Sequence, residues 1–493
     1  MKTNNPFISK SKYLSGLQCH KLLWYYYNAK EEIAEVDAAT QAIFNQGHLV
    51  GEYAKNLFPT GIEVAKGIID FGKVIDQSQQ LISKRFPLFE AAFRYKDAFA
   101  RADILNPVGK DAWDIVEVKS STEVKDINVH DVALQRYVYE GAGLKIRKCW
   151  IYCINNQYIR KGDIEPDKLF SKKEITKEVD KLLPNVENKL RKMVDIIQLA
   201  KYPGINIGPQ CSDPYDCPLI ENCWSFLPKN NVFTLTRIGK KGFEFLEDGI
   251  VDINDIPKSC RLTDKQQIQV ESIRSQKPII NSHGIRDFLK TLEYPFYFLD
   301  FETFMTAIPM YDNMRPYQSI PFQYSLHIQK SKDEKPEHYS FLADGKKDPR
   351  PEILKLLKRL LGDSGSVIAY NAGFEKGKLA DASVVFSEYK DWFEGIQNRI
   401  VDLLSPFRSF DYYHPEQRGT ASIKAVLPVL TGKSYEGMEI AEGGTASIEY
   451  LRVTFNDVSE KERQHVREQL EKYCALDTIA MVWIVEKLNK LVK

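Results

Sequence analysis

The sequence predicts a mixed α/β protein, and three observations indicate this fold class. A dense apolar strand, YPFYFLDFE, is followed by apolar and aromatic runs at 321–329 and 337–342 that have the character of strands. Helical and strand patterns then alternate over 351–404. Residues 1–226 also mix the two patterns. Strands that come first and then alternate with helices favour a sheet with helices on its faces.

The elements expected after the first strands follow from their patterns in chain order. A helix is expected near 351–361, the strand SVIAY at 366–370, and a helix near 373–385. The strand RIVDLL at 399–404 comes next, and helices continue to the end of the chain.

The length bounds the domain organisation. At about 150 residues per domain, 493 residues suggest two to four domains. We expect a first domain over 1–226, which ends in a Cys/Pro-rich segment. A helical linker over 227–290 consists of short helices and turns, and a second α/β domain spans 291–493.

Composition and charge exclude several classes of protein. Hydrophobic residues make up 43% and charged residues 27%, so disorder, collagen and coiled coil do not fit the whole chain. With 68 Lys and Arg against 67 Asp and Glu, the chain does not bind polyanions through its bulk charge, although a local basic patch is still open. No signal peptide or membrane span is expected, which favours a reducing cytoplasm. Clustered cysteines there more often bind metal.

Two carboxylates lie two positions apart on the predicted strand YFLDFET. Side chains at i and i+2 of a strand point to the same face, so Asp300 and Glu302 can meet one cation. Unpaired charges are costly to bury, and a metal ion is one reason to keep them in an apolar strand. The alternative is an exposed strand end.

Two later segments carry polar side chains where ligands often bind. Asn371 and Glu375 in YNAGFEKGKL follow the strand SVIAY, and open sheets place ligands at the carboxyl ends of their strands. Tyr473 and Asp477 in KYCALDTIAM are four apart in a helical pattern and therefore share a face. The tyrosine can hold a water while the aspartate holds metal. Taken alone, each pair is usually an ordinary feature of surface and core.

Together, the DxE, NxxF(E) and YxxxD segments resemble the motifs of the DnaQ-like (DEDD) 3′–5′ exonucleases, which have an RNase H-like fold. The resemblance covers about the last 200 residues. It implies that Asp300, Glu302, Glu375 and Asp477 hold two Mg²⁺ or Mn²⁺ ions and that Tyr473 orients the water. The family has Asp where this chain has Glu375, which puts the metal geometry in doubt. Asp402 is either a substitute carboxylate or a cap at the end of its strand.

A second constellation lies in the first domain. Glu117 and Lys119 share a face of the strand-like run WDIVEVKSS, and Asp103 precedes them by fourteen residues or more. A carboxylate pair can hold a metal while the lysine orients water or steadies developing charge. Gln135 and Tyr139 are one helical turn apart. ExK alone is common in any charged strand.

With the upstream His48, this ordered set resembles the RecB-like branch of the PD-(D/E)XK nucleases. The resemblance implies that His48, Asp103 and Glu117 bind metal, that Lys119 is catalytic, and that Gln135 and Tyr139 support the site. The alternative for His48 is an ordinary structural histidine.

Three cysteines, Cys211, Cys217 and Cys223, lie within 13 residues, and a tetrahedral site would take its fourth ligand from Cys19 or His20. Some RecB-like relatives, the CRISPR-associated exonucleases and the AddB-type helicase-nucleases, hold a [4Fe–4S] cluster with one cysteine before the nuclease core and three after it. Cys19 and the later trio resemble that arrangement. The gap between Cys211 and Cys217 is longer than the common CxxC, which leaves Zn²⁺ or ordinary thiols as alternatives. The other cysteines are expected to be buried thiols.

The region around Cys19 also has features of a nucleic-acid contact. The first 30 residues contain five lysines and no acidic residue, and the aromatic run 24–27 follows Cys19 closely. Lysines can pair with phosphates while aromatic rings stack on bases. The alternative is an amphipathic helix that buries its aromatic side chains.

The layout as a whole resembles an uncharacterised bacterial family that joins a RecB-like nuclease domain to a DnaQ-like one, in the blocks YFLDFET, AYNAGFEKGKL, SIKAVLP and YCALDTIAM. We expect a metal-dependent nuclease that acts on DNA, single-stranded or at ends, in repair, recombination or defence. RNA is open as a substrate, and a helicase or a defence complex is a candidate partner. The alternatives are that only one module cuts while the other binds, or that the chain is a non-catalytic iron–sulfur scaffold. No Walker motif is present to power unwinding.

Overall fold

The computed structural model describes residues 7–64, 67 and 70–493. Contacts within the chain divide it into two compact units. The first is Met1–Phe226 with Thr306–Gln318, and the second is Leu227–Met305 with Ser319–Lys493. Each unit combines a mixed sheet with helices, which confirms the predicted α/β class. The first unit ends where the Cys/Pro-rich segment ends, but it also takes in the segment 306–318.

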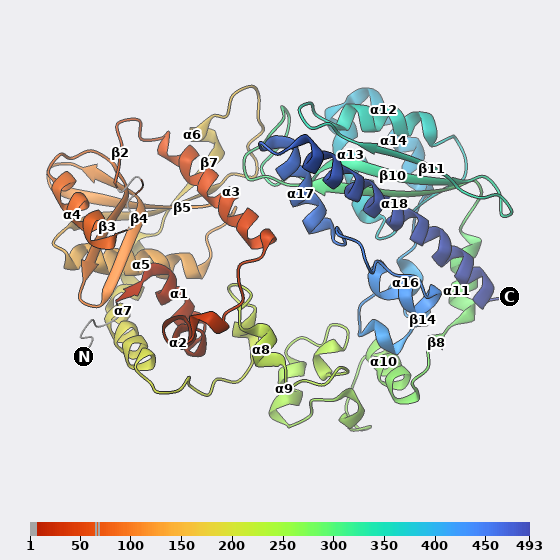
Figure 1. Cartoon of the computed structure of the whole chain (residues 1–493), viewed down its shortest axis with the longest axis horizontal. Coiled ribbons are helices and arrows are strands. Elements are labelled where there is room, and N and C mark those ends of the chain that lie inside the picture. The colour runs from red at the N-terminus through yellow and green to blue at the C-terminus, as the bar shows by residue number, and fades with distance from the viewer. Residues whose placement is uncertain (1–6, 65–66, 68–69) are drawn as a thin grey trace. The chain divides into compact units, whose positions relative to one another are not determined.

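The first unit, whose strands β2, β3, β4, β5 and β7 are labelled in Figure 1, is built on a sheet. The strand order is β2-β3-β4-β5-β6-β7, and β1 pairs with β4. Its strands are β1 (Ile8–Ser9), β2 (Ile62–Glu63), β3 (Leu88–Tyr95), β4 (Ala98–Val108), β5 (Ala112–Lys119), β6 (Lys145–Ile154) and β7 (Phe170–Glu174). Strands β3, β4 and β5 are antiparallel neighbours, whereas β5 and β6 run parallel. A parallel pair needs a crossover connection, and α5 provides it here.

The helices of the first unit cover both faces of its sheet. They are α1 (Lys10–Gln18), α2 (His20–Asn28), α3 (Ala38–Lys55), α4 (Phe71–Ile82), α5 (Asp126–Gly141), α6 (Pro166–Leu169), α7 (Thr176–Ile197) and α8 (Ile220–Trp224). Alternate residues of β5 divide between two apolar cores. Trp113 and Ile115 join the core that contains α5 and α7, while Val116 packs with Val50 of α3. Because the period of a strand is two, Glu117 falls on the same face as Ile115, toward α5.

The second unit has a five-stranded sheet in the order β11-β10-β9-β12-β13. Its strands are β9 (Phe296–Phe304), β10 (Ile320–Gln329), β11 (Glu337–Leu342), β12 (Ser366–Ala369) and β13 (Ile400–Asp402), and a separate small sheet pairs β8 (Ile279–Ile280) with β14 (Tyr412–Tyr413). Strands β9, β10 and β11 are antiparallel neighbours, and β9, β12 and β13 run parallel.

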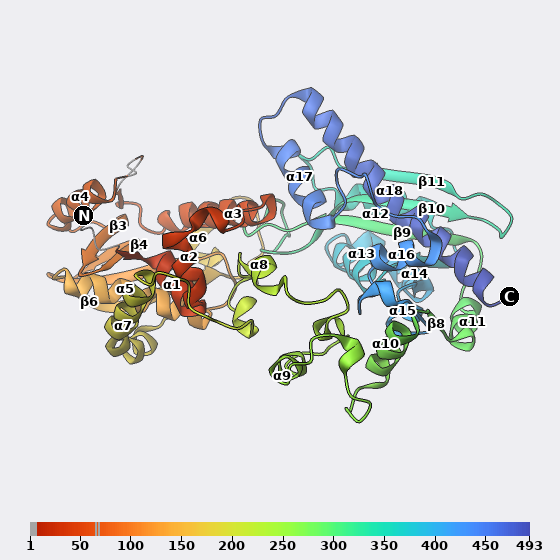
Figure 2. The same cartoon turned by 60° about the horizontal axis from the view of Figure 1, so that its bottom comes forward.

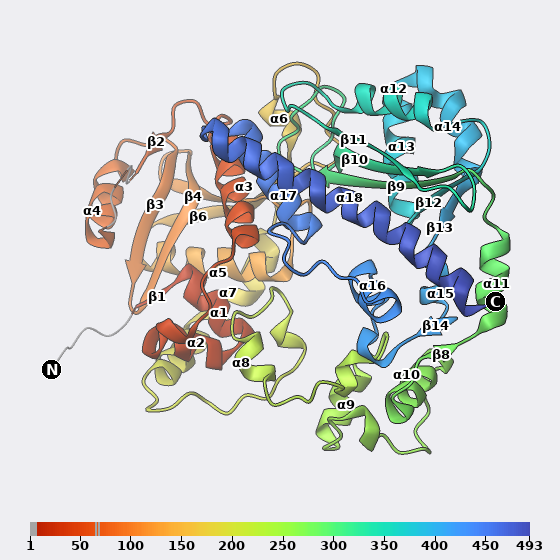
Figure 3. The same cartoon turned by 45° about the vertical axis from the view of Figure 1, so that its right-hand side comes forward.

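Helix α18 lies along one face of this sheet, and α12, α13 and α14 lie on the other (Figures 2 and 3). The helices of the unit are α9 (Lys241–Glu247), α10 (Asp264–Ser275), α11 (Ser282–Lys290), α12 (Arg350–Leu360), α13 (Gly373–Val385), α14 (Lys390–Ile396), α15 (Ser405–Arg408), α16 (Ile423–Thr431), α17 (Gly443–Phe455) and α18 (Glu460–Leu491). Leu299 and Phe301 join the core under α12 and α13. Asp300 and Glu302 therefore face α18.

The elements expected between residues 351 and 404 are present, with small shifts at their ends. Strand β13 is three residues long and ends at Asp402, short of the predicted 399–404. Residues 227–290 belong to the second unit and have a small apolar core that includes Val232, Phe245 and Ile273. Within the described residues, no helix is long and apolar enough to cross a membrane.

Candidate functional site

An acidic cluster lies between β9 and α18 of the second unit. Asp300 and Glu302 come from β9 and Asp477 from α18, and one carboxylate oxygen of each lies within 4.8 Å of the others. Glu302 and Asp477 are each only 7% exposed. Carboxylate oxygens at this spacing are ligands that Mg²⁺ and Mn²⁺ prefer. The residues therefore fit a divalent cation.

Burial raises the pKa of each carboxyl in this cluster, and repulsion by neighbouring carboxyls adds to the effect at Asp300 and Glu302. Burial, followed by Asp477 and Glu302, holds the pKa of Asp300 well above its usual value. Burial and Asp477 raise the pKa of Glu302 to about 8, and burial raises that of Asp477 to about 6. Burial and the neighbouring carboxyls therefore favour the protonated form of Asp300 and Glu302 in the metal-free site, whereas Asp477 is the most readily ionised of the three.

Glu375 belongs to the same site, although it lies outside the set of three mutually close oxygens. It stands in the first turn of α13 and is 3% exposed. Its Oε2 has no hydrogen-bond partner, and burial followed by Asp402 raises its pKa to about 8. Glu375 lines a cavity of ≈ 280 Å³ with Asp300, Glu302 and Asn371. A buried carboxyl oxygen that has no hydrogen-bond partner is available as a ligand for a bound cation.

Asp402 serves as a strand-end cap, one of its two predicted roles. Its Oδ1 accepts the backbone N–H groups of Asn371 (2.9 Å), Ala372 (3.2 Å) and Leu404 (3.1 Å). Its Oδ2 lies 3.3 Å from Arg408 Nη1. These bonds hold Asn371 at a φ of 72°, in the left-handed region. The carboxylate is thus used to shape the turn that leads into α13.

Tyr473 and two side chains that the motifs did not name complete the C-terminal site. Tyr473 is buried beside Asp477, and burial and Asp477 raise its pKa. The Tyr435 hydroxyl donates to Asp477 Oδ1 at 2.5 Å. Lys424 Nζ lies 5.6 Å from the Tyr473 ring centre, and its charge lowers the pKa of Glu302 against the other effects. Lys424 lies in the block SIKAVLP, whereas Tyr435 had no sequence signal.

The metal-free protein is expected to lose stability through this site as the pH rises. Folding raises the pKa of Glu302 from its usual 4.5 to about 8, so the folded state holds the proton more tightly than the unfolded state. The protonated Glu302 therefore makes its full contribution to the free energy of unfolding below about pH 4.5, and this contribution is lost as the pH rises toward 8. Glu302→Gln should therefore melt higher than the wild type at pH 8 and show a flatter pH dependence, measured by thermal unfolding in EDTA.

The exposed residue Glu247 of α9 supplies the control for this experiment. Glu247→Gln makes the same chemical change away from the cluster and should follow the wild-type pH dependence. A Glu302→Gln protein whose melting temperature tracks the wild type at every pH would contradict the assignment of a strained proton-holding cluster.

The N-terminal constellation is brought together on the face of β5 that meets α5. Lys119 Nζ donates to Glu117 Oε1 at 2.6 Å, and Gln135 Nε2 donates to Glu117 Oε2 at 2.7 Å. The Glu117 side chain is 1% exposed. Although burial raises the pKa of Glu117, Lys10 and Lys119 hold it below its usual value. The ExK pair and Gln135 therefore form one polar network.

Two residues of this network were missed by the motif. Asp131 of α5 lies 2.8 Å from Lys119 Nζ, and it is 1% exposed. Lys10 of α1 lies 2.7 Å from Glu117 Oε1 and 3.6 Å from Asp131 Oδ1. Asp131 is four residues before Gln135 and so shares its helix face, which was a usable signal. Lys10 is 107 residues from Glu117 and had none.

The remaining predicted residues of this site have different surroundings. Asp103 Oδ2 accepts the N–H of Val118 at 2.7 Å, and burial and Glu117 raise the pKa of Asp103 to about 7. The Tyr139 hydroxyl donates to Ala91 O and accepts from the N–H of Ala102, so it ties α5 to β3 and β4. His48 is exposed on α3 and is not part of the network.

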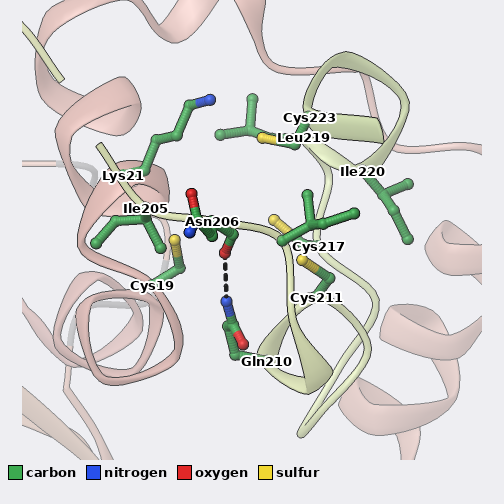
Figure 4. Close-up of a pocket in the computed structure, with 11 residues that line it drawn as sticks. Cys19, Lys21, Ile205, Asn206, Gln210, Cys211, Cys217, Leu219, Ile220 and Cys223 are labelled. Carbon is green, nitrogen blue, oxygen red and sulfur yellow. Dashed lines mark hydrogen bonds between the residues drawn. The ribbon is translucent and has the colours of Figure 1, made fainter. Parts of the chain in front are cut away.

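The four predicted cysteines line one cavity of ≈ 20 Å³ in the first unit (Figure 4). Cys19 lies between α1 and α2, Cys211 and Cys217 lie in the loop before α8, and Cys223 lies on α8. All four are free thiols. His20 is not among the lining residues. The structure thus joins cysteines that are up to 204 positions apart.

Burial raises the pKa of two of these thiols and so favours their protonated form in the metal-free protein. Burial raises the pKa of Cys19, while backbone N–H groups of Leu22 and Lys21 at the start of α2 lower it. Burial raises the pKa of Cys217 to about 11, and the other three sulfurs add to the effect. A single Zn²⁺ with four bonds of about 2.3 Å would bring its sulfurs within roughly 4 Å of one another.

The aromatic run after Cys19 is used largely inside the fold. Tyr25 is buried, the Trp24 Nε1 donates to Leu199 O at 2.9 Å, and the Tyr27 hydroxyl donates to Phe7 O at 2.8 Å. Lys12 Nζ lies 3.0 Å from the centre of the Tyr26 ring. These contacts agree with the alternative of an amphipathic helix that buries its aromatic side chains.

The known proteins to which the chain is similar have descriptions that name no activity. Residues 297–422 match the family described as "Domain of unknown function (DUF2779)". The chain is 27% identical over 250 residues to "Uncharacterized protein MG366" of Mycoplasma genitalium, which covers 47% of this chain and 37% of the relative. It is 25% identical over 206 residues to "Uncharacterized protein MG366 homolog" of Mycoplasma pneumoniae, which covers 38% and 31%. The chain spans about a third of the length of these curated relatives.

The family match includes three of the acidic residues of the C-terminal site. Asp300, Glu302 and Glu375 fall within 297–422, whereas Tyr473 and Asp477 follow it. The descriptions of the family and of the relatives state no reaction, so the functional argument rests on the geometry of the sites.

Proposed function

We propose that the protein is a metal-dependent nuclease whose second unit is a DnaQ-like module that removes nucleotides from the 3′ ends of DNA. The observation that carries this proposal is the buried set of carboxylates Asp300, Glu302 and Asp477, whose oxygens lie within 4.8 Å of one another. The strand order β11-β10-β9-β12-β13, with three antiparallel strands followed by two parallel ones, supports an RNase H-like assignment.

In this proposal, Asp300, Glu302, Glu375 and Asp477 hold two Mg²⁺ or Mn²⁺ ions. Bound there, the ions would stabilise both the attacking and the leaving oxygens of a phosphodiester. Tyr473 orients the attacking water, and Tyr435 fixes the carboxylate of Asp477 through its hydroxyl. Lys424 supplies a positive charge on the same side of the site. The cavity beside Glu302 and Asn371 leaves room for the end of a strand.

The first unit is proposed as a second, RecB-like nuclease module. Asp103 and Glu117 lie on adjacent strands and are the candidate metal ligands, and Lys119 is the candidate catalytic lysine. Gln135 orients Glu117, and Tyr139 braces the helix that carries Gln135. The four cysteines would hold a [4Fe–4S] cluster that links the segment around Cys19 to the segment 211–223.

A second candidate function has one cutting module and one binding platform. The C-terminal module has Glu375 where the DnaQ-like exonucleases have an aspartate, and this difference makes it the candidate binding platform. A non-catalytic iron–sulfur scaffold predicts nucleic-acid binding without metal-dependent cleavage. Cytoplasmic location, action in repair, recombination or defence, and a helicase or defence-complex partner belong to the same proposal.

The two modules can be separated in one assay. Full-length protein purified without oxygen is incubated with single-stranded DNA labelled separately at each end, with Mg²⁺ or Mn²⁺, and RNA is tested in parallel. Lys119→Ala should remove the products of the first unit and leave shortening from the 3′ end, because the carboxylates that Lys119 contacts, Glu117 and Asp131, both belong to the first unit. Asp103→Asn is a milder companion, since its amide oxygen can still accept the Val118 N–H.

Each result of this assay decides between the alternatives. Two distinct product ladders, each lost in one variant, support two nucleases. A Lys119→Ala protein that cuts like the wild type would make the first unit a binding platform. No cleavage of DNA or RNA with either metal would overturn the nuclease proposal.

A further inference from the structure

A polar pocket of ≈ 500 Å³ lies beyond the carboxyl ends of β5 and β6, and every residue that lines it belongs to the first unit. These strands are parallel and paired as far as Lys119 and Cys153. The lining residues are Ser121 and Thr122 after β5, Asn156 and Gln157 after β6, and the segment 315–318. Open sheets bind ligands at this edge, where parallel strands end.

The segment 306–318 forms a wall that is anchored to the first unit. Ala307 and Ile308 are buried in the apolar core that contains Val116. The Arg160 guanidinium donates to Pro309 O at 3.0 Å and to Met310 O at 2.6 Å. The hydroxyl of Tyr317, the residue between the lining residues Pro316 and Gln318, donates to the carbonyl of Ser120. The pocket is therefore preformed, which lowers the entropic cost of binding.

The chemistry of the lining suits a phosphate backbone. The side chains offer hydroxyl, carboxamide and guanidinium groups, and no carboxylate lines the pocket. Arg315 is exposed, and within the described residues its guanidinium makes no hydrogen bond or ion pair. Gln318 Oε1 accepts the N–H of Arg315 at 3.0 Å, which leaves the amide NH₂ of Gln318 available. Arginine, threonine and glutamine donors are the usual contacts to phosphate oxygens.

The pocket begins directly after the strand that carries two of the proposed catalytic residues, Glu117 and Lys119. Lys119 is the last residue of β5, two positions before Ser121, and its Nζ lies 2.6 Å from Glu117 Oε1. We propose that this pocket binds the sugar–phosphate backbone of one nucleic-acid strand, next to the phosphodiester that the first unit cuts. The proposal rests on the nuclease function proposed for that unit, and it names a strand-binding subsite with Arg315 as its charged contact.

Binding can be measured separately from cleavage. The full-length protein is titrated in EDTA against a fluorescent single-stranded DNA and, in a second arm, the matching RNA, and anisotropy gives Kd over a range of salt concentrations. Arg315→Ala should weaken binding about tenfold, which corresponds to the loss of one charged contact. It should also make the slope of log K against log salt shallower by about 0.7, the value for one phosphate on a single strand. Arg315→Lys keeps the charge and should restore the slope.

Lys110 supplies the matched control, because it lies exposed in the turn before β5, at the opposite end of that strand. Lys110→Ala removes the same charge and should bind like the wild type. The proposal is overturned if Arg315→Ala and Lys110→Ala have equal effects, if the salt slope is unchanged, or if the wild type binds neither nucleic acid. Arg315-dependent binding in EDTA, together with no cleavage in the assay with Mg²⁺ or Mn²⁺, would support the subsite and reject the nuclease activity. The DNA and RNA arms identify the kind of strand.

Discussion

Asp300→Asn should abolish shortening of DNA from its 3′ end. At pH 8, the metal-free variant should be at least as stable as the wild type. Burial, followed by repulsion from Asp477 and Glu302, raises the pKa of Asp300. The amide keeps the shape of the side chain and removes one repelling charge, so the empty site loses strain. The same change removes a ligand of the proposed ions, and we expect at least about a thousandfold loss of rate.

Two measurements on one protein sample test this prediction. End-labelled DNA gives the rate, and thermal unfolding with and without Mn²⁺ gives the stabilisation by metal, which is expected in the wild type and absent in Asp300→Asn. Asp363→Asn, at an exposed position, makes the same chemical change and should match the wild type in both. An Asp300→Asn protein that still gains stability from Mn²⁺ and still shortens DNA would contradict the metal site.

Cys217→Ser should remove the proposed iron–sulfur cluster and lower the melting temperature by an amount on the order of 10 °C. Cys217 is 7% exposed and lies in a small core with Leu22, Tyr25 and Leu219. A cluster held there would join Cys19 to three cysteines that lie about two hundred residues later in the chain. Its loss would free both segments, so stability as well as cofactor content should fall.

Cofactor content is read from iron, sulfide and zinc analysis and from the visible absorbance of protein purified without oxygen. Cys260→Ser provides the control, since Cys260 packs against the small core of residues 227–290 and does not line the cavity of the four cysteines. One zinc per chain and no iron would show that the four cysteines hold zinc and not an iron–sulfur cluster. Wild-type protein with neither metal, and a melting temperature equal to that of Cys217→Ser, would show that these are ordinary thiols.

These experiments also separate the roles of the two units. Loss of the cluster is expected to affect the first unit, which contains all four cysteines, while the acidic cluster belongs to the second. A Cys217→Ser protein should therefore keep its Mn²⁺-dependent stabilisation.

The sequence alone determined the features that depend on local periodicity. The spacing of Asp300 and Glu302 places both on one face of β9, and the spacing of Tyr473 and Asp477 places both on one face of α18. The same argument placed Glu117 and Lys119 together on β5. The α/β class and most elements between 351 and 404 followed from patterns that each segment carries by itself.

Only the tertiary structure decided which faces meet. Lys10 reaches Glu117 across 107 positions, and Tyr435 reaches Asp477 across 42, because packing brings α1 to β5 and the loop after α16 to α18. The choice between a metal ligand and a cap at Asp402 depended on three backbone N–H groups, and the inclusion of 306–318 in the first unit depended on burial of Ala307 and Ile308. A periodic pattern fixes the direction of a side chain within its element, whereas its partners are fixed by burial of apolar faces that lie far apart in the chain.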